Sequence, residues 1–178
     1  MSPVPAVEIR ALSASREIIE GLSEILIETV ASGGSVTFMH PLERRAARAF
    51  WQGALAAAAQ GERFVLGAFV DERIVGTATL LVDCPPNQPH RGEIAKMMTR
   101  PSHRGRGVAT ALLRAAEVEA VKRARTLLTL DTAADDGASG FYEKQGFTLA
   151  GTIPDYALKP HGGLTATMLY WKRIGSRA

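Results

Sequence analysis

A loop rich in arginine and glycine is the part of the sequence best suited to chemistry. The segment RPSHRGRG (100–107) runs directly into the helical pattern VATALLRAAE (108–117). The N–H groups that begin a helix lack partners within it and carry positive partial charge, so they can bind an anion. Arg104 and Arg106 add charge, and Gly105 and Gly107 let the backbone approach a ligand closely. The loop predicts a phosphate site, although a flexible basic turn would have the same composition.

Other common sites for phosphates or metals do not fit. The loop lacks the Gly-Lys-Ser/Thr ending of a P-loop and the third glycine of a dinucleotide-binding turn. The histidines are scattered through segments expected to be loops, and no His/Cys cluster has the spacing of metal ligands, so we expect no metal.

The elements that position the loop alternate between strand and helix patterns. A strand at 7–12 precedes a helix capped by Ser13 or Ser15, and the segment 32–35 ends this helix. The remaining pattern predicts a helix at 41–61, strands at 63–70, 73–82 and 92–99, a helix at 108–124, a strand at 126–132, a short helix at 137–145, and strands at 147–153 and 165–172. This mixed order, with no internal repeat, predicts one α/β domain.

Composition narrows the class of protein and its partners. The 178 residues are 46% hydrophobic and 22% charged, with a net charge of +3, which is too small for a surface that coats nucleic acid. No apolar run approaches the roughly 20 residues of a membrane span, and MSPVPAVEIRAL (1–12) does not have the pattern of a leader. A single cysteine, Cys84, cannot form an internal disulfide. We therefore expect a cytoplasmic protein that binds neither nucleic acid nor membrane.

Two motifs together resemble the GNAT superfamily of N-acetyltransferases. RGRGVA (104–109) is similar to the family's pyrophosphate-binding signature, and ASGFYEKQGF (138–147) is similar to its short tyrosine-bearing helix that closes with Gly-Phe. The likeness covers about residues 6–173 and implies one N-acetyltransferase domain over 1–178. It also implies the α/β (α+β) GNAT fold, a mixed, mostly antiparallel twisted sheet flanked by about four helices. Segments such as ETVASGGSVTFM, EIAKMM and PDYALKPHGGLTATMLY resemble tabtoxin-resistance enzymes, which acetylate a β-lactam amino-acid toxin.

The resemblance implies acetyl-CoA as co-substrate and assigns residues to it. The pyrophosphate would lie on the amides of 104–109, and Met97, Met98 and Thr99 would line the pantetheine arm, although methionines in a strand are also typical of a core. Asp135 stands where the family usually has asparagine, and a carboxylate is a poor neighbour for phosphates. The implied cofactor residues are Met97, Met98, Thr99, Arg104, Gly105, Arg106, Gly107, Val108, Ala109, Asp135 and Tyr142.

Acetyl transfer to an amine also requires proton transfer. An amine with a pKa near 10 is neutral in only about one molecule per thousand at pH 7, so a base is needed. The resemblance implies Glu93 and Asp131 as the base, through water, and Tyr142 as the acid that protonates the leaving sulfur. In a regular strand, Glu93 would share a face with Met97 and Thr99. Alternatively, Glu93 pairs with Arg91, Asp131 caps a turn and Tyr142 is a core residue.

The acceptor is expected to contact segments that vary in such folds. Phe38, His40, Tyr156 and His161 are candidates, and Glu93 and Asp131 would hold the amino group. We predict transfer to a small-molecule amine, with a β-lactam amino acid as the leading candidate. Alternatives are a protein or peptide amine, or a non-catalytic acyl-CoA sensor. The exposed edges of an open sheet also lead us to expect a homodimer.

Overall fold

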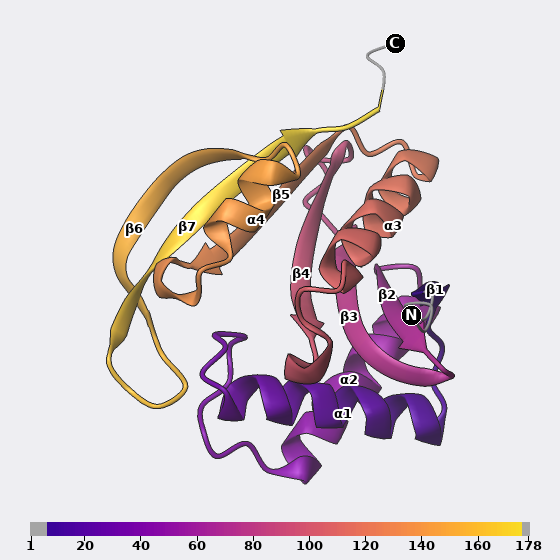
Figure 1. Cartoon of the computed structure of the whole chain (residues 1–178). Coiled ribbons are helices and arrows are strands. Elements are labelled where there is room, and N and C mark those ends of the chain that lie inside the picture. Colours follow the sequence, from indigo (N-terminus) through magenta and orange to yellow (C-terminus); the bar gives the residue numbers. More distant parts are fainter. Residues whose placement is uncertain (1–6, 176–178) are drawn as a thin grey trace, which may run out of the picture.

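Seven strands form one mixed sheet in the computed structural model, which describes residues 7–175 (Figure 1). The strand order is β1-β2-β3-β4-β5-β7-β6, and every neighbouring pair is antiparallel except β4 and β5. The strands are β1 (Glu8–Ala11), β2 (Arg63–Val70), β3 (Arg73–Leu81), β4 (Arg91–Thr99), β5 (Leu127–Ala133), β6 (Thr148–Leu158) and β7 (Leu164–Arg173). The predicted mixed, mostly antiparallel sheet is confirmed. The ends of the predicted 1–178 domain, including half of the segment in which we expect no leader, lie outside the described residues.

Helices cover both faces of this sheet (Figure 1). The helices are α1 (Arg16–Ala31), α2 (Arg44–Ala59), α3 (Val108–Lys122) and α4 (Ser139–Lys144), with short 3₁₀ turns η1 (Pro101–His103) and η2 (Ala134–Asp136). The hydroxyl of Ser15 accepts a hydrogen bond from the N–H of Ile18 at 3.2 Å, so the predicted cap of α1 is present. The predicted order of strands and helices is confirmed along the described chain.

Two apolar clusters hold the helices against the sheet. One cluster packs α3 on the strands through residues such as Leu112 and Leu128, and the other packs α1 and α2 through residues such as Leu22 and Trp51. Strands β2 and β3 contribute to both clusters, which explains their nearly continuous apolar sequence. The centre of the sheet is therefore a rigid platform for the segments at its ends.

Strands β4 and β5 pair over only part of their length. Their parallel register runs from Arg91↔Leu127 to Glu93↔Thr129, although β4 continues to Thr99 and β5 to Ala133. Beyond Glu93 the two strands diverge (Figure 1). The edge of β4 that faces β5 is therefore free of strand pairing at residues 97–99, where the family resemblance implies a bound coenzyme arm.

A bulge interrupts β4 next to this divergence. Thr79 pairs with Ala95 and Thr77 with Met98, so Ala78 faces two residues, Lys96 and Met97. Lys96 has a positive φ of 50°, and the bulge shifts every later side chain to the other face of the sheet. Ile94 and Met97 consequently both pack toward the α3 cluster. The prediction that Glu93 shares a face with Met97 and Thr99 is wrong, because it assumed a regular strand.

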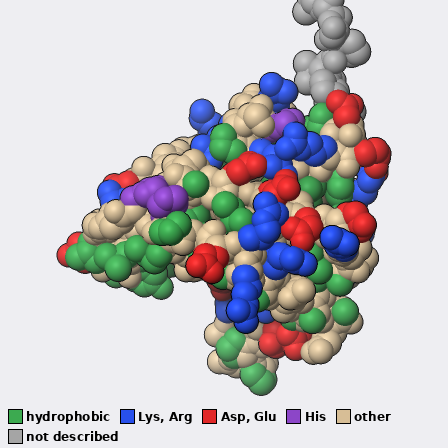
Figure 2. Space-filling model, turned by 90° about the horizontal axis from the view of Figure 1, so that it is seen from below, with side chains coloured by type: hydrophobic (Ala, Val, Ile, Leu, Met, Phe, Trp, Pro, Cys, Tyr) green, Lys and Arg blue, Asp and Glu red, His purple; other side chains and the backbone are tan. Residues whose placement is uncertain are grey.

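The hairpin of β6 and β7 forms one end of the molecule. Figure 2 shows hydrophobic side chains gathered at this end, whereas acidic and basic side chains intermingle over the rest of that face. The exposed apolar residues of the hairpin are Leu149, Ile153, Tyr156, Leu158, Leu164 and Leu169. Tyr156, expected in a loop, lies within β6, which is longer than its sequence pattern predicts. No helix among residues 7–175 is long and apolar enough to cross a membrane.

Candidate active site

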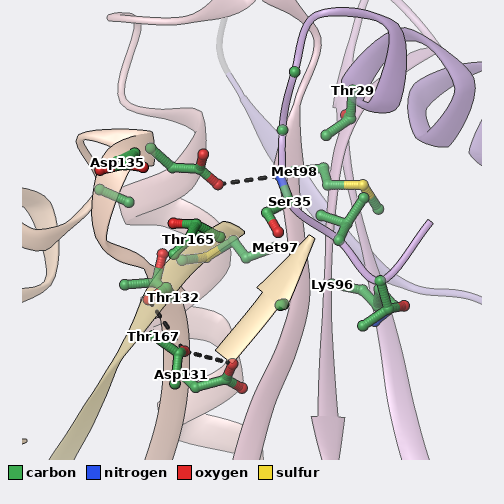
Figure 3. Close-up of a pocket in the computed structure, with 18 of the residues that line it drawn as sticks. Thr29, Ser35, Lys96, Met97, Met98, Asp131, Thr132, Asp135, Thr165 and Thr167 are labelled. Carbon is green, nitrogen blue, oxygen red and sulfur yellow. Dashed lines mark hydrogen bonds between the residues drawn. The ribbon is translucent and has the colours of Figure 1, made fainter. Parts of the chain in front are cut away.

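A cleft of about 910 Å³ opens where β4 and β5 diverge. Its walls come from the loop after α1, the end of β4, the start of α3, the end of β5, helix α4 and the β6–β7 hairpin (Figure 3). The predicted site residues that line it are Phe38, Met97, Met98, Thr99, Arg104, Ala109, Asp131, Asp135, Tyr142 and Tyr156. The fold therefore brings most of the predicted residues together from segments far apart in the chain.

The two methionines lie on different faces of β4 within this cleft. Figure 3 shows their side chains pointing to opposite sides of the strand, and they pack toward different apolar clusters. The side chain of Met98 is buried against α1 and α2, whereas Met97 is partly exposed. Met98 is therefore a core residue by its side chain, and its backbone pairs with Thr77 of β3.

The glycine-arginine loop has the backbone form that the anion-site prediction requires. Gly105 and Gly107 have φ values of 73° and 79°, in the left-handed region that favours glycine. Gly107 is the N-cap of α3 and makes no side-chain cap bond, so the first N–H groups of the helix have no cap. The side chain of Val108 is buried in the core, which leaves only its backbone for a ligand. Gly105, Arg106 and Gly107 lie beside the lined cleft rather than in its wall.

Tyr142 lies on α4, where its ring is buried and it forms part of the cleft wall. The ring packs on Phe141, Phe147 and Tyr170 at centroid distances of 5.2, 5.9 and 6.0 Å. Burial raises the pKa of Tyr142 well above its usual value, and the negative charge of Asp131 raises this pKa further. The phenol is therefore protonated at neutral pH. Gly146, with a φ of 84°, ends α4 in the predicted left-handed conformation.

The two predicted carboxylates differ in their surroundings. Asp131 lines the cleft from β5, and its Oδ2 accepts a hydrogen bond from Thr167 Oγ1 at 3.1 Å (Figure 3). Glu93 does not line the cleft and forms an ion pair with Arg91 at 3.0 Å. Arg91 also donates to Thr129 Oγ1 at 3.0 Å, which holds this pair at the last paired step of β4 and β5. Of the alternatives that the sequence left open for Glu93, the pairing with Arg91 is present.

Lys96 is a cleft residue that the sequence analysis did not single out. It is half-buried, and its Nζ lies 5.7 Å from the centroid of the Phe50 ring on α2. Burial lowers the pKa of Lys96, and the charges of Asp131 and Glu93 partly offset this effect. The one charged residue inside the apolar stretch IAKMM (94–98) was the available signal.

The loop between α1 and α2 is tied across the cleft to η2 and to the β6–β7 turn. The N–H of Ser35 donates to Asp136 Oδ2 at 3.1 Å, and the N–H of His40 donates to the carbonyl of Pro160 at 2.9 Å. The rings of His40 and His161 lie 4.4 Å apart, and His161 Nε2 lies 3.0 Å from the carbonyl oxygen of Ala31. Neither histidine lines the cleft, so these two predicted substrate residues hold the loop in place.

Asp135, at the position where the resembling family usually has asparagine, lies next to the positive charge of Lys159. Lys159 Nζ forms an ion pair with Asp135 Oδ2 at 3.2 Å, and both side chains are partly exposed. The pair offsets the negative charge that would otherwise lie at this edge of the cleft. Among residues 7–175, no group of three or more His, Cys, Asp or Glu side chains could hold a metal ion.

Comparisons with known proteins agree with this fold. The model of the acetyltransferase (GNAT) family matches residues 27–147. An N-acetyltransferase from Staphylococcus aureus Mu50 is 20% identical, with a TM-score of 0.78 over 94% of this chain and 98% of that chain. A ribosomal-protein-alanine N-acetyltransferase from Brucella melitensis is 22% identical, with a TM-score of 0.78 over 94% and 99% of the two chains. The Salmonella typhimurium protein yncA, solved with its cofactor acetyl-CoA, is 18% identical, with a TM-score of 0.78 over 97% and 96%. At these identities the likeness establishes the fold.

Proposed function

The chain belongs to the GNAT family of acetyltransferases, and from this premise we propose that it acetylates the amine of a small molecule, using acetyl-CoA. Our leading candidate for the acceptor is a β-lactam or related amino-acid toxin. The observation that carries the small-molecule assignment is the tied loop between α1 and α2. Its hydrogen bonds to η2 and to the β6–β7 turn hold the loop across one side of the cleft, which favours a compact amine over a chain of residues.

The described residues fit a bound coenzyme at two places. The divergence after Glu93↔Thr129 leaves a strand edge at the end of β4 that can hydrogen-bond an extended arm. The uncapped start of α3, with its two left-handed glycines, suits phosphate groups. We assign the arm to the backbone of 97–99 and the pyrophosphate to the amides of 104–109. When bound there, acetyl-CoA supplies an acetyl group activated as a thioester.

Asp131 is the better placed of the two carboxylates to accept the proton of the acceptor amine. It lines the cleft and has no cationic partner at ion-pair distance among the described residues. Glu93 is paired with Arg91 and lies outside the cleft wall, so it is less accessible to an amine. We assign Asp131 to the amino group and Glu93 to a second position that acts through water.

Tyr142 is assigned as the general acid. Its phenol is protonated at neutral pH and its residue lines the cleft, so it can donate a proton to the leaving sulfur. In the complete transfer a nitrogen–carbon bond forms and a carbon–sulfur bond breaks. The amine proton goes to the carboxylate of Asp131, and the proton of the Tyr142 phenol goes to the sulfur of the leaving coenzyme A.

The experiment that tests the proposed function is an acceptor panel with detection of the free thiol released. The panel contains amino acids, amino sugars, polyamines and β-lactam amino acids, together with peptides that carry a free N-terminus or a lysine. We expect turnover of one or more small amines. Turnover of peptides alone would identify a protein acetyltransferase, and acetyl-CoA binding without turnover of any amine would identify a sensor.

A further inference from the structure

Lys96 is the charged group of the cleft to which the proposed reaction gives no role. The bulge in β4 places it on the face of the sheet that α2 covers, with its ammonium group beside the Phe50 ring. Phe50 packs edge-on against Phe38 at 5.3 Å, and Phe38 lines the acceptor side of the cleft. Lys96 therefore lies next to the aromatic wall that an acceptor would meet.

Positive charge is scarce in the cleft wall. Among the described residues that line it, only Lys96 and Arg104 are cationic, and Arg104 belongs to the loop assigned to phosphate. The remaining charged residues in the wall are acidic: Asp131, Asp135 and Asp136. The part of the cleft that faces an acceptor thus combines carboxylate character with one ammonium group.

The ammonium group of Lys96 lacks an anionic partner within residues 7–175. Asp131 and Glu93 lie close enough to raise its pKa, but neither comes within ion-pair distance. Removing a charge from water costs free energy unless a counter-charge or hydrogen bonds replace the water. A contact with an aromatic face replaces only part of that solvation.

We propose that Lys96 binds the carboxylate of an amino-acid acceptor, while Asp131 faces the amino group of the same molecule. A zwitterion brings one anion for Lys96 and one cation for the carboxylates, so its charges complement those of the wall. This inference rests on the proposed function, because it specifies which small amines the enzyme accepts. The cleft then selects amines that carry a carboxylate over otherwise identical neutral analogues.

The first test compares amino acids with their carboxamides, in which only the carboxylate is neutralised. Wild-type enzyme should prefer the acid, and Lys96→Met should lower kcat/KM for the acid by about 10- to 100-fold, as expected for a charge-assisted hydrogen bond. The loss should appear as a higher KM for the acid. For the carboxamide, kcat/KM should change by less than about 3-fold. Lys96→Arg should retain most of the preference. Lys122→Met, at a side chain that is 63% exposed on α3, is the matched control.

The second test measures ligand binding to Lys96 without turnover. The chain has five lysines, so reductive methylation with a ¹³C label gives few signals, and Lys96→Met identifies the one from Lys96. Acetate is titrated against chloride at constant ionic strength, with coenzyme A bound. We expect acetate to shift the Lys96 signal and to leave those of the other lysines in place.

The outcomes separate the two proposals. If no amine of the panel is acetylated, the proposed function is wrong, and the acetate titration still decides whether Lys96 binds a carboxylate. If amines are acetylated but Lys96→Met lowers kcat/KM for the amino acid and for its carboxamide by the same factor, the proposed function stands and the role of Lys96 is refuted. An unmoved Lys96 signal in acetate also refutes it.

Discussion

Replacing Tyr142 with phenylalanine tests the catalytic assignment most directly, because the change removes one oxygen atom from a buried ring. The ring contacts with Phe141, Phe147 and Tyr170 remain. Among the described residues, no side-chain hydrogen bond involves the hydroxyl of Tyr142, and this atom is not one of the buried polar atoms without a partner, so its loss leaves no other buried group unsatisfied. We therefore expect the free energy of unfolding to change by less than about 1 kcal/mol.

The rate should respond very differently. A positioned general acid contributes about 10²–10⁴-fold, so Tyr142→Phe should lower kcat by that factor, which corresponds to about 2.7–5.4 kcal/mol of barrier. The assay is steady-state thiol release with the best acceptor of the panel, with unfolding in urea measured in parallel. Tyr170→Phe is the matched control, because it removes a hydroxyl that donates to Glu143 Oε1 at 3.1 Å in the same aromatic group. Tyr170→Phe should lower the free energy of unfolding by about 1 kcal/mol and leave kcat nearly unchanged.

The raised pKa of Tyr142 adds a pH signature. A group whose pKa is higher in the folded than in the unfolded protein stabilises the fold below its unfolded value, here 10.0, and this contribution is lost as the pH rises above it. Wild type should therefore lose stability above pH 10 more steeply than Tyr142→Phe. An unchanged kcat in Tyr142→Phe would refute the general-acid assignment, and equal stability curves would refute the stated pKa shift.

The remaining predictions concern the phosphate loop, the base and the packing of α1. Gly107→Ala should weaken acetyl-CoA binding by about 5- to 30-fold, because a Cβ at a φ of 79° adds about 1–2 kcal/mol of strain to the loop form that binds. Gly53→Ala in α2 should leave binding unchanged in calorimetry. Asp131→Asn should lower the rate of acetyl transfer mainly at pH values below the pKa of the acceptor amine, and an unchanged pH profile contradicts the base assignment. The same change should lower the pKa of Lys96 in an NMR titration, because the charge of Asp131 raises it. Arg100→Met should lower the free energy of unfolding in urea by about 1–3 kcal/mol, because this buried side chain donates to the carbonyl of Ile74 at 3.0 Å and pairs with Glu24 and Glu28 of α1. A decrease below about 0.5 kcal/mol contradicts that role.

The homodimer remains a prediction, and the structure adds a surface to it. Strand β6 lies at the edge of the sheet, and large apolar side chains of the hairpin are exposed. Sedimentation velocity at micromolar concentration measures the oligomeric state directly.

The sequence by itself predicted the features that depend on neighbouring residues. Strand and helix order, the Ser15 cap, the left-handed Gly146 and the glycine loop before α3 all follow from side-chain periodicity and backbone preferences over a few residues. Tyr142 could be assigned because it lies inside a recognisable local motif. For such features the nearest residues along the chain supply most of the relevant contacts.

Tertiary structure decided which of the predicted side chains meet. The cleft exists because the pairing of β4 and β5 stops at Glu93 and Thr129, which are far apart in sequence, and no local pattern encodes that register. The bulge at Lys96 has a similar origin, since it depends on how β4 aligns with β3. Side chains alternate with period two only while that alignment is regular, so one extra residue placed Met97 on the face opposite Glu93 and turned Lys96 toward the acceptor side.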